Sequence, residues 1–233
     1  MLTRHQSQSG ITLIELMIGM LLGLVVTGVA INMYISTLGI TSQTTRTVRL
    51  NQEIRAAMDL MVNDIRRAGY WDGPVVGENP HSKVVSGAGS SARLHVNLFD
   101  SPETSSSSLY DCVILSYDYD EDGSANPNHV FGFRLNDSAQ IQALQLTGVA
   151  SGAGAVNCAA GTSSDWVSLT DSKAISVDEL EFNYTDGSSA GISAASWADS
   201  SSKGIVINLK AHSKADPKLV RQLVEEARVR NEY

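Results

Sequence analysis

The sequence predicts an α+β fold in which one long N-terminal helix packs on an antiparallel β-sheet domain. Three observations predict this fold. No proline interrupts residues 11–68, so nothing breaks a helix there. Apolar side chains recur at steps of three and four residues between residues 48 and 68, which is the helical period. After residue 70, short apolar runs alternate with clusters of Gly, Ser, Asn and Asp, as strands and turns do.

The composition sets limits on the class of protein. A chain of 233 residues can bury a sizeable core in one or two domains. Its formal net charge is −8, and its basic residues are scattered or near the C-terminus, whereas a nucleic-acid binder is expected to carry a basic patch. We therefore predict no nucleic-acid partner.

The first part of the predicted helix is apolar enough for a membrane. No charged residue lies between Glu15 and Arg46, and residues 11–31 supply about the 20 apolar positions that a bilayer span needs. We place the transmembrane half at about residues 11–38. The preceding head, residues 1–10, carries one arginine and no acid, which orients the N-terminus to the cytoplasm and exports residues 70–233.

Glu15 sits inside this apolar segment, and three interpretations of the segment compete. A cleaved secretory signal would use the small residues "GVA" at 28–30, but ordinary signals carry charge before the apolar core. A plain anchor would leave the acid without a role, although an ionisable residue in a span is functional by default. In the third interpretation the acid acts in assembly. Gly19 and Gly23 form a G-x-x-x-G pair that allows close helix approach, although such pairs are common in spans.

The second part of the helix is amphipathic, and we place the whole helix at residues 11–69. If it is continuous over residues 11–68, it is roughly 87 Å long. Gly69 is a natural C-terminal stop. The predicted apolar stripe, which we expect to face the globular domain, consists of Val48, Ile54, Ala57, Met58, Met61, Ile65 and Ala68.

Six strands are predicted in the globular part, at residues 92–99, 111–119, 129–135, 140–148, 173–185 and 204–213. Residues 100–108 and 185–204 read as loops. In the C-terminal tail, Leu219, Val220, Leu223, Val224 and Ala227 fit a helix, but the end of the tail also fits an edge strand paired with 204–213. We favour the strand, partly because the family resemblance given below implies it, since periodicity alone does not decide between the two.

Two cysteines, Cys112 and Cys158, lie in the part that is exported if the N-terminus anchors the chain. An isolated pair in an oxidising compartment predicts one disulfide. Closing a loop of this size would stabilise the fold by roughly 4 kcal/mol on the chain-entropy model. The alternative is a pair of buried thiols.

The segment "DYDEDG" contains the strongest local pattern for chemistry. Asp118, Asp120 and Asp122, followed by Gly123, match the first half of a D-x-D-x-D-G calcium loop. The twelfth position is His129 and not a bidentate Glu, so the pattern is not that of an EF-hand. A looser calcium site, completed by backbone carbonyls or by Asn126, competes with a solvated acidic turn that binds no cofactor.

No pattern indicates an enzyme. The sequence has no G-x-S-x-G, no P-loop and no dinucleotide-binding fingerprint. The five histidines follow no metal-binding spacing, and we expect them to be scattered surface residues.

The N-terminal segment "GITLIELMIG", residues 10–19, resembles the class III signal of type IV prepilins. The resemblance implies that prepilin peptidase cuts after Gly10 and methylates the new N-terminal residue, Ile11, where the family more often has Phe. It also implies that Glu15 faces the positive N-terminal amine of a neighbouring subunit. Cleavage creates that amine, so processing and pairing are linked.

Further segments resemble the PilW group of minor pilins: "NQEIRAAMDLMVNDIRRAGYW", "DCVILSYDYDEDG", "FGFRLND", "WVSLTD", "ISVDELEFNYT" and the terminal "VRN". The resemblance implies a pilin-like fold and a low-abundance subunit that initiates type IV pili or caps their tip. Its partners would be other minor pilins, the major pilin, prepilin peptidase and the inner-membrane assembly platform. The chain would first lie in the bacterial inner membrane, with its C-terminal domain in the periplasm, and later in the pilus, which serves adhesion and twitching motility.

Two other functions stay open at this point. The N-terminal signal also fits a minor pseudopilin of a type II secretion system. The acidic loop also fits a membrane-anchored periplasmic module that binds ligands with calcium.

Overall fold

The computed structural model describes residues 10–73, 96–99, 110–123, 129–145, 158, 165–185 and 204–230. Within these residues the fold is α+β, as predicted: one long helix and two antiparallel sheets. Contacts divide the chain into two compact units, residues 1–46 and 47–233. The second half of the helix therefore belongs to the globular unit.

The helix α1 runs continuously over Leu13–Arg67, slightly inside the predicted range of 11–69. It starts at Leu13 because Thr12 caps it: the N–H groups of Glu15 and Leu16 both donate to the Thr12 carbonyl, at 3.1 and 3.2 Å. It ends before Gly69, whose φ of 76° is the left-handed conformation that glycine adopts without strain.

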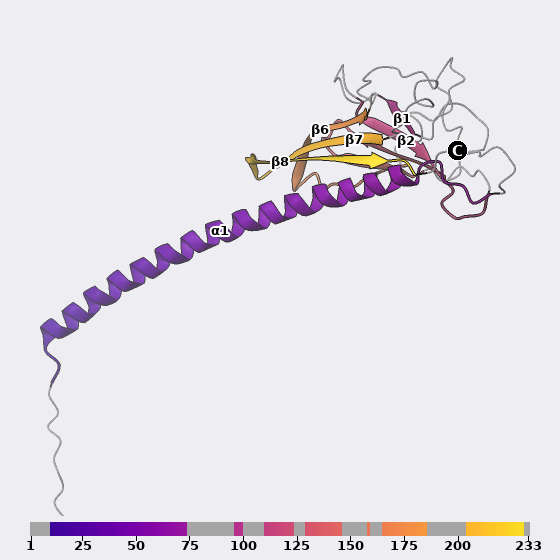
Figure 1. Cartoon of the computed structure of the whole chain (residues 1–233). Helices are drawn as coiled ribbons and strands as arrows, with labels where there is room; N and C mark the ends of the chain where they lie inside the picture. Colours follow the sequence, from indigo (N-terminus) through magenta and orange to yellow (C-terminus); the bar gives the residue numbers. More distant parts are fainter. Residues whose placement is uncertain are drawn as a thin grey trace, which may run out of the picture. The chain divides into compact units, whose positions relative to one another are not determined.

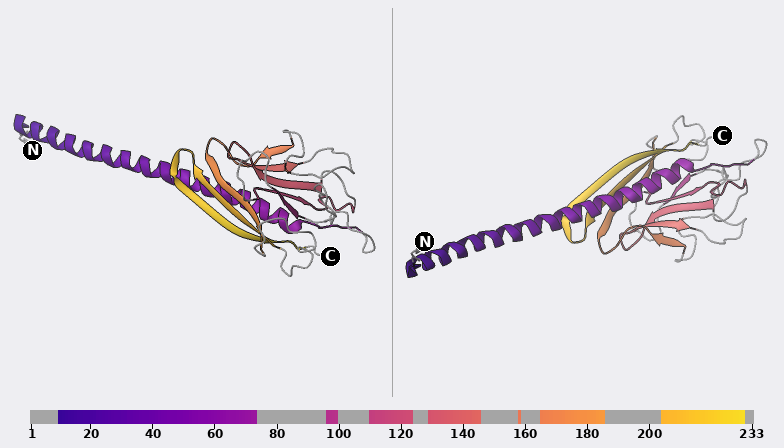
Figure 2. Two further views of the ribbon diagram at one scale, coloured as in Figure 1. Left: turned by 90° about the horizontal axis from the view of Figure 1, so that it is seen from above. Right: turned by 90° about the horizontal axis from the view of Figure 1, so that it is seen from below.

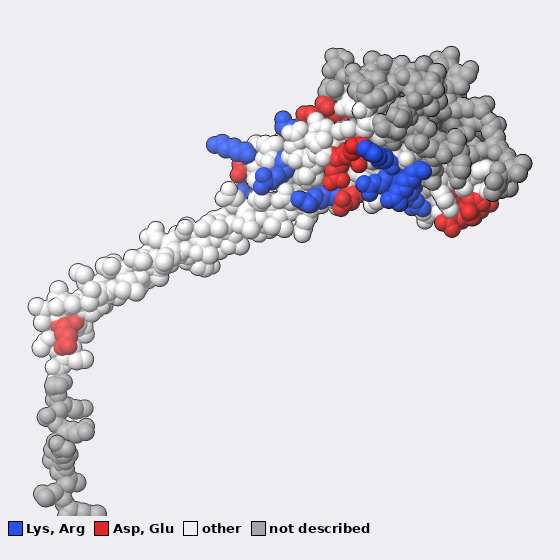
Figure 3. Space-filling model, in the orientation of Figure 1, with Lys and Arg blue, Asp and Glu red and all other residues white. Residues whose placement is uncertain are grey.

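All residues from 10 to 46 are exposed within the chain, although most of them are apolar. Figure 3 shows this stretch as uncharged surface apart from an acidic patch near its start, where Glu15 lies. The helix is long and apolar enough to cross a membrane. Its polar side chains bond to their own backbone four residues earlier: Thr27 to the Gly23 carbonyl at 2.7 Å and Asn32 to the Gly28 carbonyl at 3.0 Å. Such bonds satisfy polar side chains where water is absent.

The second half of α1 packs on the sheets through most of the predicted stripe (Figures 1 and 2). Its buried residues are Leu50, Ile54, Ala57, Met58, Met61, Val62 and Ile65, followed by Ala68 just beyond the helix. Val48 was wrongly included, because 46% of its surface is exposed. Leu50 and Val62 were missed although both are buried, because the sheets cover a face wider than one stripe.

The first sheet contains five strands in sequential order, each antiparallel to its neighbour. They are β1 (Val96–Phe99), β2 (Cys112–Ser116), β3 (Val130–Leu135), β4 (Ile141–Gln145) and β5 (Trp166–Ser168). The four predicted strands at 92–99, 111–119, 129–135 and 140–148 are confirmed within the described residues. β5 was not predicted, because a strand of three residues shows no readable alternation.

The second sheet contains β6 (Ile175–Tyr184), β7 (Gly204–Ser213) and β8 (Asp216–Arg228), in the order β6-β7-β8. The tail is therefore the predicted edge strand and pairs with β7 from Gly204↔Arg228 to Ser213↔Asp216. Only every second side chain on the inward face of β8 is apolar. These apolar residues therefore recur every four residues, which is close to the helical period. Leu219, Leu223 and Ala227 are buried or half-buried, whereas the intervening Arg221 and Glu225 are exposed. The predicted loops at 100–108 and 185–204 lie almost wholly outside the described residues.

The main core is one cluster formed by the second half of α1 and both sheets. A second cluster covers the other face of the first sheet and contains Cys112, Ile114, Leu144, Cys158 and Trp166. Because both faces of β2 are covered, all five of its residues are buried. Gly132 of β3 leaves room there: a Cβ at this position would lie 2.6 Å from the Ile114 Cδ1 atom.

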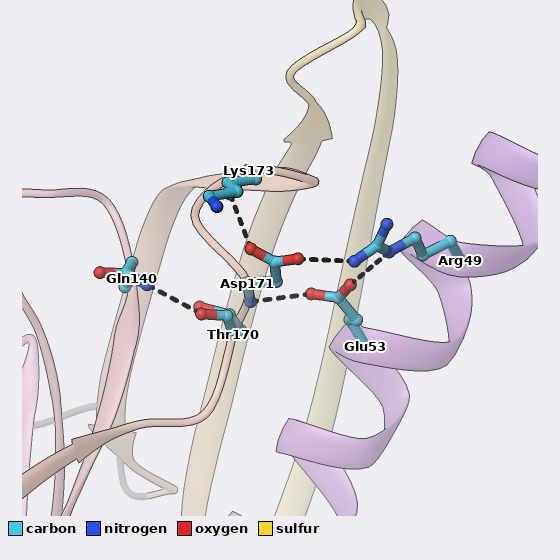
Figure 4. Close-up of polar contacts among 6 residues, drawn as sticks. All are labelled: Arg49, Glu53, Gln140, Thr170, Asp171 and Lys173. Carbon is cyan, nitrogen blue, oxygen red and sulfur yellow. Dashed lines mark hydrogen bonds and ion pairs between the residues drawn. The ribbon is translucent and has the colours of Figure 1, made fainter.

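A polar contact also joins α1 to the loop before β6 (Figure 4). Arg49 bonds to Glu53 at 3.0 Å and to the Asp171 carboxylate at 2.6 Å, and the Asp171 N–H donates to Glu53 at 3.1 Å. Both ion pairs are partly exposed, so each contributes little to stability. Their main effect is to position the loop, since Asp171 also accepts the Lys173 N–H at 2.8 Å.

Met61 and Leu60 provide a test of the helix packing. Met61 is fully buried, whereas 40% of the surface of its neighbour Leu60 is exposed. Met61→Ala leaves a cavity in the main core and should lower the free energy of unfolding by about 2–5 kcal/mol. Leu60→Ala should lower it by about 0.5 kcal/mol or less. Urea unfolding of the full chain in detergent micelles measures both, and equal losses would contradict the packing described.

Candidate functional sites

The first candidate site is the predicted cleavage and assembly segment, Gly10 to Glu15. Gly10 and Ile11 precede the helix and are exposed, and Ile11 keeps 77% of its surface accessible. No atom lies within 4 Å of the place where a Cβ would be added to Gly10. A glycine at this position is therefore not required by packing within the chain.

Glu15 occupies the third position of the first helical turn, after its cap at Thr12. The Glu15 N–H lies 3.4 Å from the Thr12 hydroxyl, in addition to its bond to the Thr12 carbonyl. A Thr followed three residues later by Glu is a capping-box sequence. A negative charge in the first turn also stabilises a helix through its dipole. This structural role was not predicted, although the "TLIE" spacing at 12–15 indicates it.

The second candidate site is the acidic turn after β2, which we define as Asp118, Asp120, Asp122 and His129. One ligand atom from each of these four residues lies within 4.8 Å of every other. Asp118 and His129 are buried, and Asp120 and Asp122 are exposed. The three predicted carboxylates thus gather in one place. Asn126, proposed as a further ligand, lies outside the described residues.

His129 corrects the prediction that the histidines are surface residues. Its side chain is 0% exposed, and its Nε2 atom lies 2.8 Å from Asp120 Oδ1. His212 is half-buried and pairs with Asp178 at 2.7 Å, whereas His5, His81 and His95 lie outside the described residues. The buried imidazole could not be foreseen, because nothing in the local pattern shows which loop residue turns inward.

Among the described residues, hydrogen bonds reach only one oxygen of the Asp118 carboxylate. Its Oδ2 atom accepts the N–H of Asp72 at 3.2 Å and the N–H of Gly123 at 3.0 Å. Burial by itself raises the pKa of Asp118. Hydrogen bonds from these two N–H groups and from the Asp122 N–H, together with the nearby His129, lower the pKa by more than burial raises it, so the pKa lies below its usual value. Its Oδ1 atom is buried and has no hydrogen-bond partner in the part of the chain that the structure describes.

Backbone bonds join the acidic turn to the end of α1. The Gly69 N–H donates to the Ser116 carbonyl and the Asp118 N–H to the Tyr70 carbonyl, both at 2.8 Å. The Trp71 indole N–H donates to the Gly123 carbonyl, also at 2.8 Å. The turn is tight, with φ values of 58° at Glu121 and 70° at Gly123. The chain after the helix therefore holds the turn in place.

Tyr117 packs beneath the acidic turn and adds side-chain contacts to α1. Its hydroxyl donates to Asp64 at 3.2 Å, its ring stacks on Phe131 with centroids 4.4 Å apart, and the Arg67 guanidinium lies 4.7 Å above the ring. Burial raises the pKa of the Asp64 carboxyl, and the Tyr117 hydrogen bond and the Arg67 charge oppose that rise only in part. Asp64 therefore binds a proton more readily in the folded state.

The predicted disulfide between Cys112 and Cys158 is present. Arg134 supports it from the neighbouring strand by donating to the Cys158 carbonyl at 3.0 Å. The same guanidinium bonds to Gln142 at 2.9 Å and lies 4.1 Å above the Trp166 ring. The bridge therefore ties Cys158 to the face of the first sheet that carries the second cluster.

Comparison with known families identifies the class of protein. Residues 5–31 match the prokaryotic N-terminal methylation motif. This motif, on a long apolar helix joined to antiparallel sheets, defines a pilin-like protein that carries a prepilin signal. Such proteins are processed by prepilin peptidase and assemble with other pilins.

Residues 43–229 match the family model of prepilin peptidase-dependent protein B, and the chain belongs to that family. The match covers nearly all of the globular unit, which includes the second half of α1. No curated protein and no solved structure matches the chain.

Asp64→Asn tests the electrostatics beneath the acidic turn. Because the pKa of Asp64 is raised on folding, the folded state binds a proton more tightly than the unfolded chain does. The free energy of unfolding of the wild type, measured relative to Asp64→Asn, should therefore rise as the pH falls from 7 to 4.

Urea unfolding of the full chain at pH 7 and at pH 4 measures this difference. Asp59→Asn, on the exposed face of the same helix, is the control and should show no such trend. If the stability of the wild type relative to Asp64→Asn fell as the pH decreased, the sign would be wrong for a carboxylate whose pKa is raised by burial. That result would refute the raised pKa of Asp64.

Proposed function

We propose that the protein is a minor pilin of the PilW group, which acts in type IV pilus assembly as a low-abundance subunit of the filament or its tip complex. The observation that carries this proposal is a methylation motif at the start of an N-terminal segment, residues 10–46, that is exposed and largely apolar. A surface of this kind is stable only against lipid or other apolar helices. A pilin meets both surroundings in turn, first the membrane and then the filament.

In this proposal the leader, residues 1–10, is removed in the cytoplasm by prepilin peptidase, and Ile11 becomes the methylated N-terminus. The mature subunit is held in the bacterial inner membrane by residues 11–38, with residues 70–233 in the periplasm. The inner-membrane assembly platform then transfers it into the pilus beside other minor pilins and the major pilin. Its role is assembly and not catalysis.

The proposed role of Glu15 is to pair with a neighbouring subunit's N-terminal amine. Glu15 and Arg46 bracket a stretch without charge, so no cation of the span itself can neutralise the carboxylate. A charge pair is stronger in such surroundings than in water. The cap at Thr12 places Glu15 in the first helical turn, close in sequence to the amine that cleavage after Gly10 would create.

Close approach of helices within the filament is supported by the glycines of the span. Gly19, Gly23 and Gly28 have no atom within 4 Å of an added Cβ, so no contact within the chain uses their small size. A minor pseudopilin of a type II secretion system would present the same helix. Crosslinking in cells, followed by identification of the crosslinked subunits, separates the two functions.

Gly10→Ala tests the cleavage site. The substitution should abolish processing, so that mass spectrometry of the purified chain finds an unmethylated N-terminus at Met1, whereas the wild type begins at methylated Ile11. Gly28→Ala is the matched control, because its Cβ would also enter open space, and it should be processed normally. A wild-type N-terminus at Ile31 would instead indicate an ordinary secretory signal.

Glu15→Gln tests the charge pair separately from the helix cap. Glutamine also serves in a capping box, so the helix start should persist while the negative charge is lost. Cleavage should be unaffected, but incorporation into sheared filaments should fall roughly tenfold or more, because one partner of a desolvated ion pair is removed. Asp59→Asn is the exposed acidic control. Normal incorporation of Glu15→Gln would exclude the pairing role.

A further inference from the structure

We infer that the acidic turn is a metal site in which Asp118, Asp120, Asp122 and His129 bind one divalent ion that accepts an imidazole nitrogen, of the Mn²⁺ or Zn²⁺ class. This inference is independent of the proposed function, since neither membrane insertion nor filament assembly requires a metal in the globular unit. It differs from the calcium loop that the spacing of the aspartates suggests.

The four ligand atoms are close enough to share one ion. Metal–ligand bonds of about 2.0–2.6 Å place two atoms bound to the same ion at most about 4–5 Å apart. In the acidic turn every pair of ligand atoms lies within 4.8 Å. Three of the atoms come from alternate residues of one turn and the fourth from His129, the residue directly before β3, so an ion would close the turn onto the sheet.

Asp118 provides an independent sign that a cation belongs there. Its side chain is 0% exposed, and its Oδ1 atom has no hydrogen-bond partner among the described residues. Two backbone N–H groups already occupy Oδ2, so Oδ1 is the oxygen left for a further ligand. A buried carboxylate oxygen without a partner is unfavourable, and coordination of a metal ion is one way to satisfy it.

His129 decides the class of ion. Calcium binds oxygen ligands, whereas imidazole nitrogen is a preferred ligand of transition metals, and carboxylates suit Mn²⁺ as well. The Nε2 atom of His129 is fully buried and points to the acidic group, 2.8 Å from Asp120 Oδ1. When the ion binds, any proton on Nε2 is released to solvent, and the nitrogen and the Asp120 oxygen bind the ion side by side.

Bound metal should stabilise the globular unit, because backbone bonds join Asp118 to Tyr70, just after α1, and His129 to Tyr117, just after β2. An ion that binds only the folded state raises the melting temperature by mass action. At an ion concentration of about one hundred times the dissociation constant, a domain of this size should gain about 5 °C or more.

The test uses the full chain in detergent micelles, without a polyhistidine tag, after treatment with EDTA and dialysis. Isothermal titration calorimetry and thermal unfolding are carried out with Mn²⁺, Zn²⁺ and Ca²⁺ in turn. The expected result is one Mn²⁺ or Zn²⁺ per chain with a rise in melting temperature, and binding of Ca²⁺ at least tenfold weaker.

Variants assign the binding to the four residues. Asp118→Asn and His129→Gln should weaken binding of Mn²⁺ or Zn²⁺ at least tenfold and remove the rise in melting temperature. Asp118 and His129 are buried, so their substitution also perturbs packing. Asp122 is exposed, so Asp122→Asn should fold normally and still bind the ion more weakly. Asp137→Asn, an exposed aspartate in the turn after β3, is the matched control and should bind like the wild type.

Three results would overturn the inference. The wild type could bind none of the ions, in which case the His129–Asp120 contact alone closes the turn. Asp122→Asn and His129→Gln could bind as tightly as the wild type, which would place the ion elsewhere. Calcium could bind most tightly and independently of His129, which would contradict the role given to the imidazole.

Discussion

The structure depends on one helix that must be apolar for two different reasons along its length. From residue 10 to 46, α1 and the residues before it are exposed within the chain, so lipid or other helices must cover their apolar surface. From residue 47 onward the helix supplies the centre of the core, with residues such as Met61 and Ile65 fully buried under both sheets. Because α1 is continuous through Arg67, one helix both presents the exposed apolar surface and fills the core of the globular unit.

The end of α1 determines where the second candidate site lies. Gly69 stops the helix, and the residues that follow bond to the end of β2, so the turn carrying Asp118 sits directly beside the helix exit. The acidic turn is therefore bonded to the residues that directly follow α1. Any ion bound there would act on the junction between helix and sheet.

Much of the fold could be predicted from the sequence, and the failures have specific causes. The helix and six strands were predicted because their periodicity is local and long enough to read. β5 is too short to show a pattern, and β8 looked partly helical because exposed Arg221 and Glu225 interrupt its inward face. Val48 has the right period but is exposed. For the candidate sites, the three aspartates were predicted, but the burial of His129 was not.

The sequence by itself determined the features that depend on neighbouring residues. These are the processing motif, the apolar segment bracketed by Glu15 and Arg46, the helix stop at Gly69 and the alternation of most strands. Only the tertiary structure decided which residues meet across the chain. The contact of His129 with Asp120, the unpaired Asp118 oxygen and the support of the disulfide by Arg134 all require separate segments to come together. Such contacts depend on the packing of the whole globular unit, which no short stretch of sequence encodes.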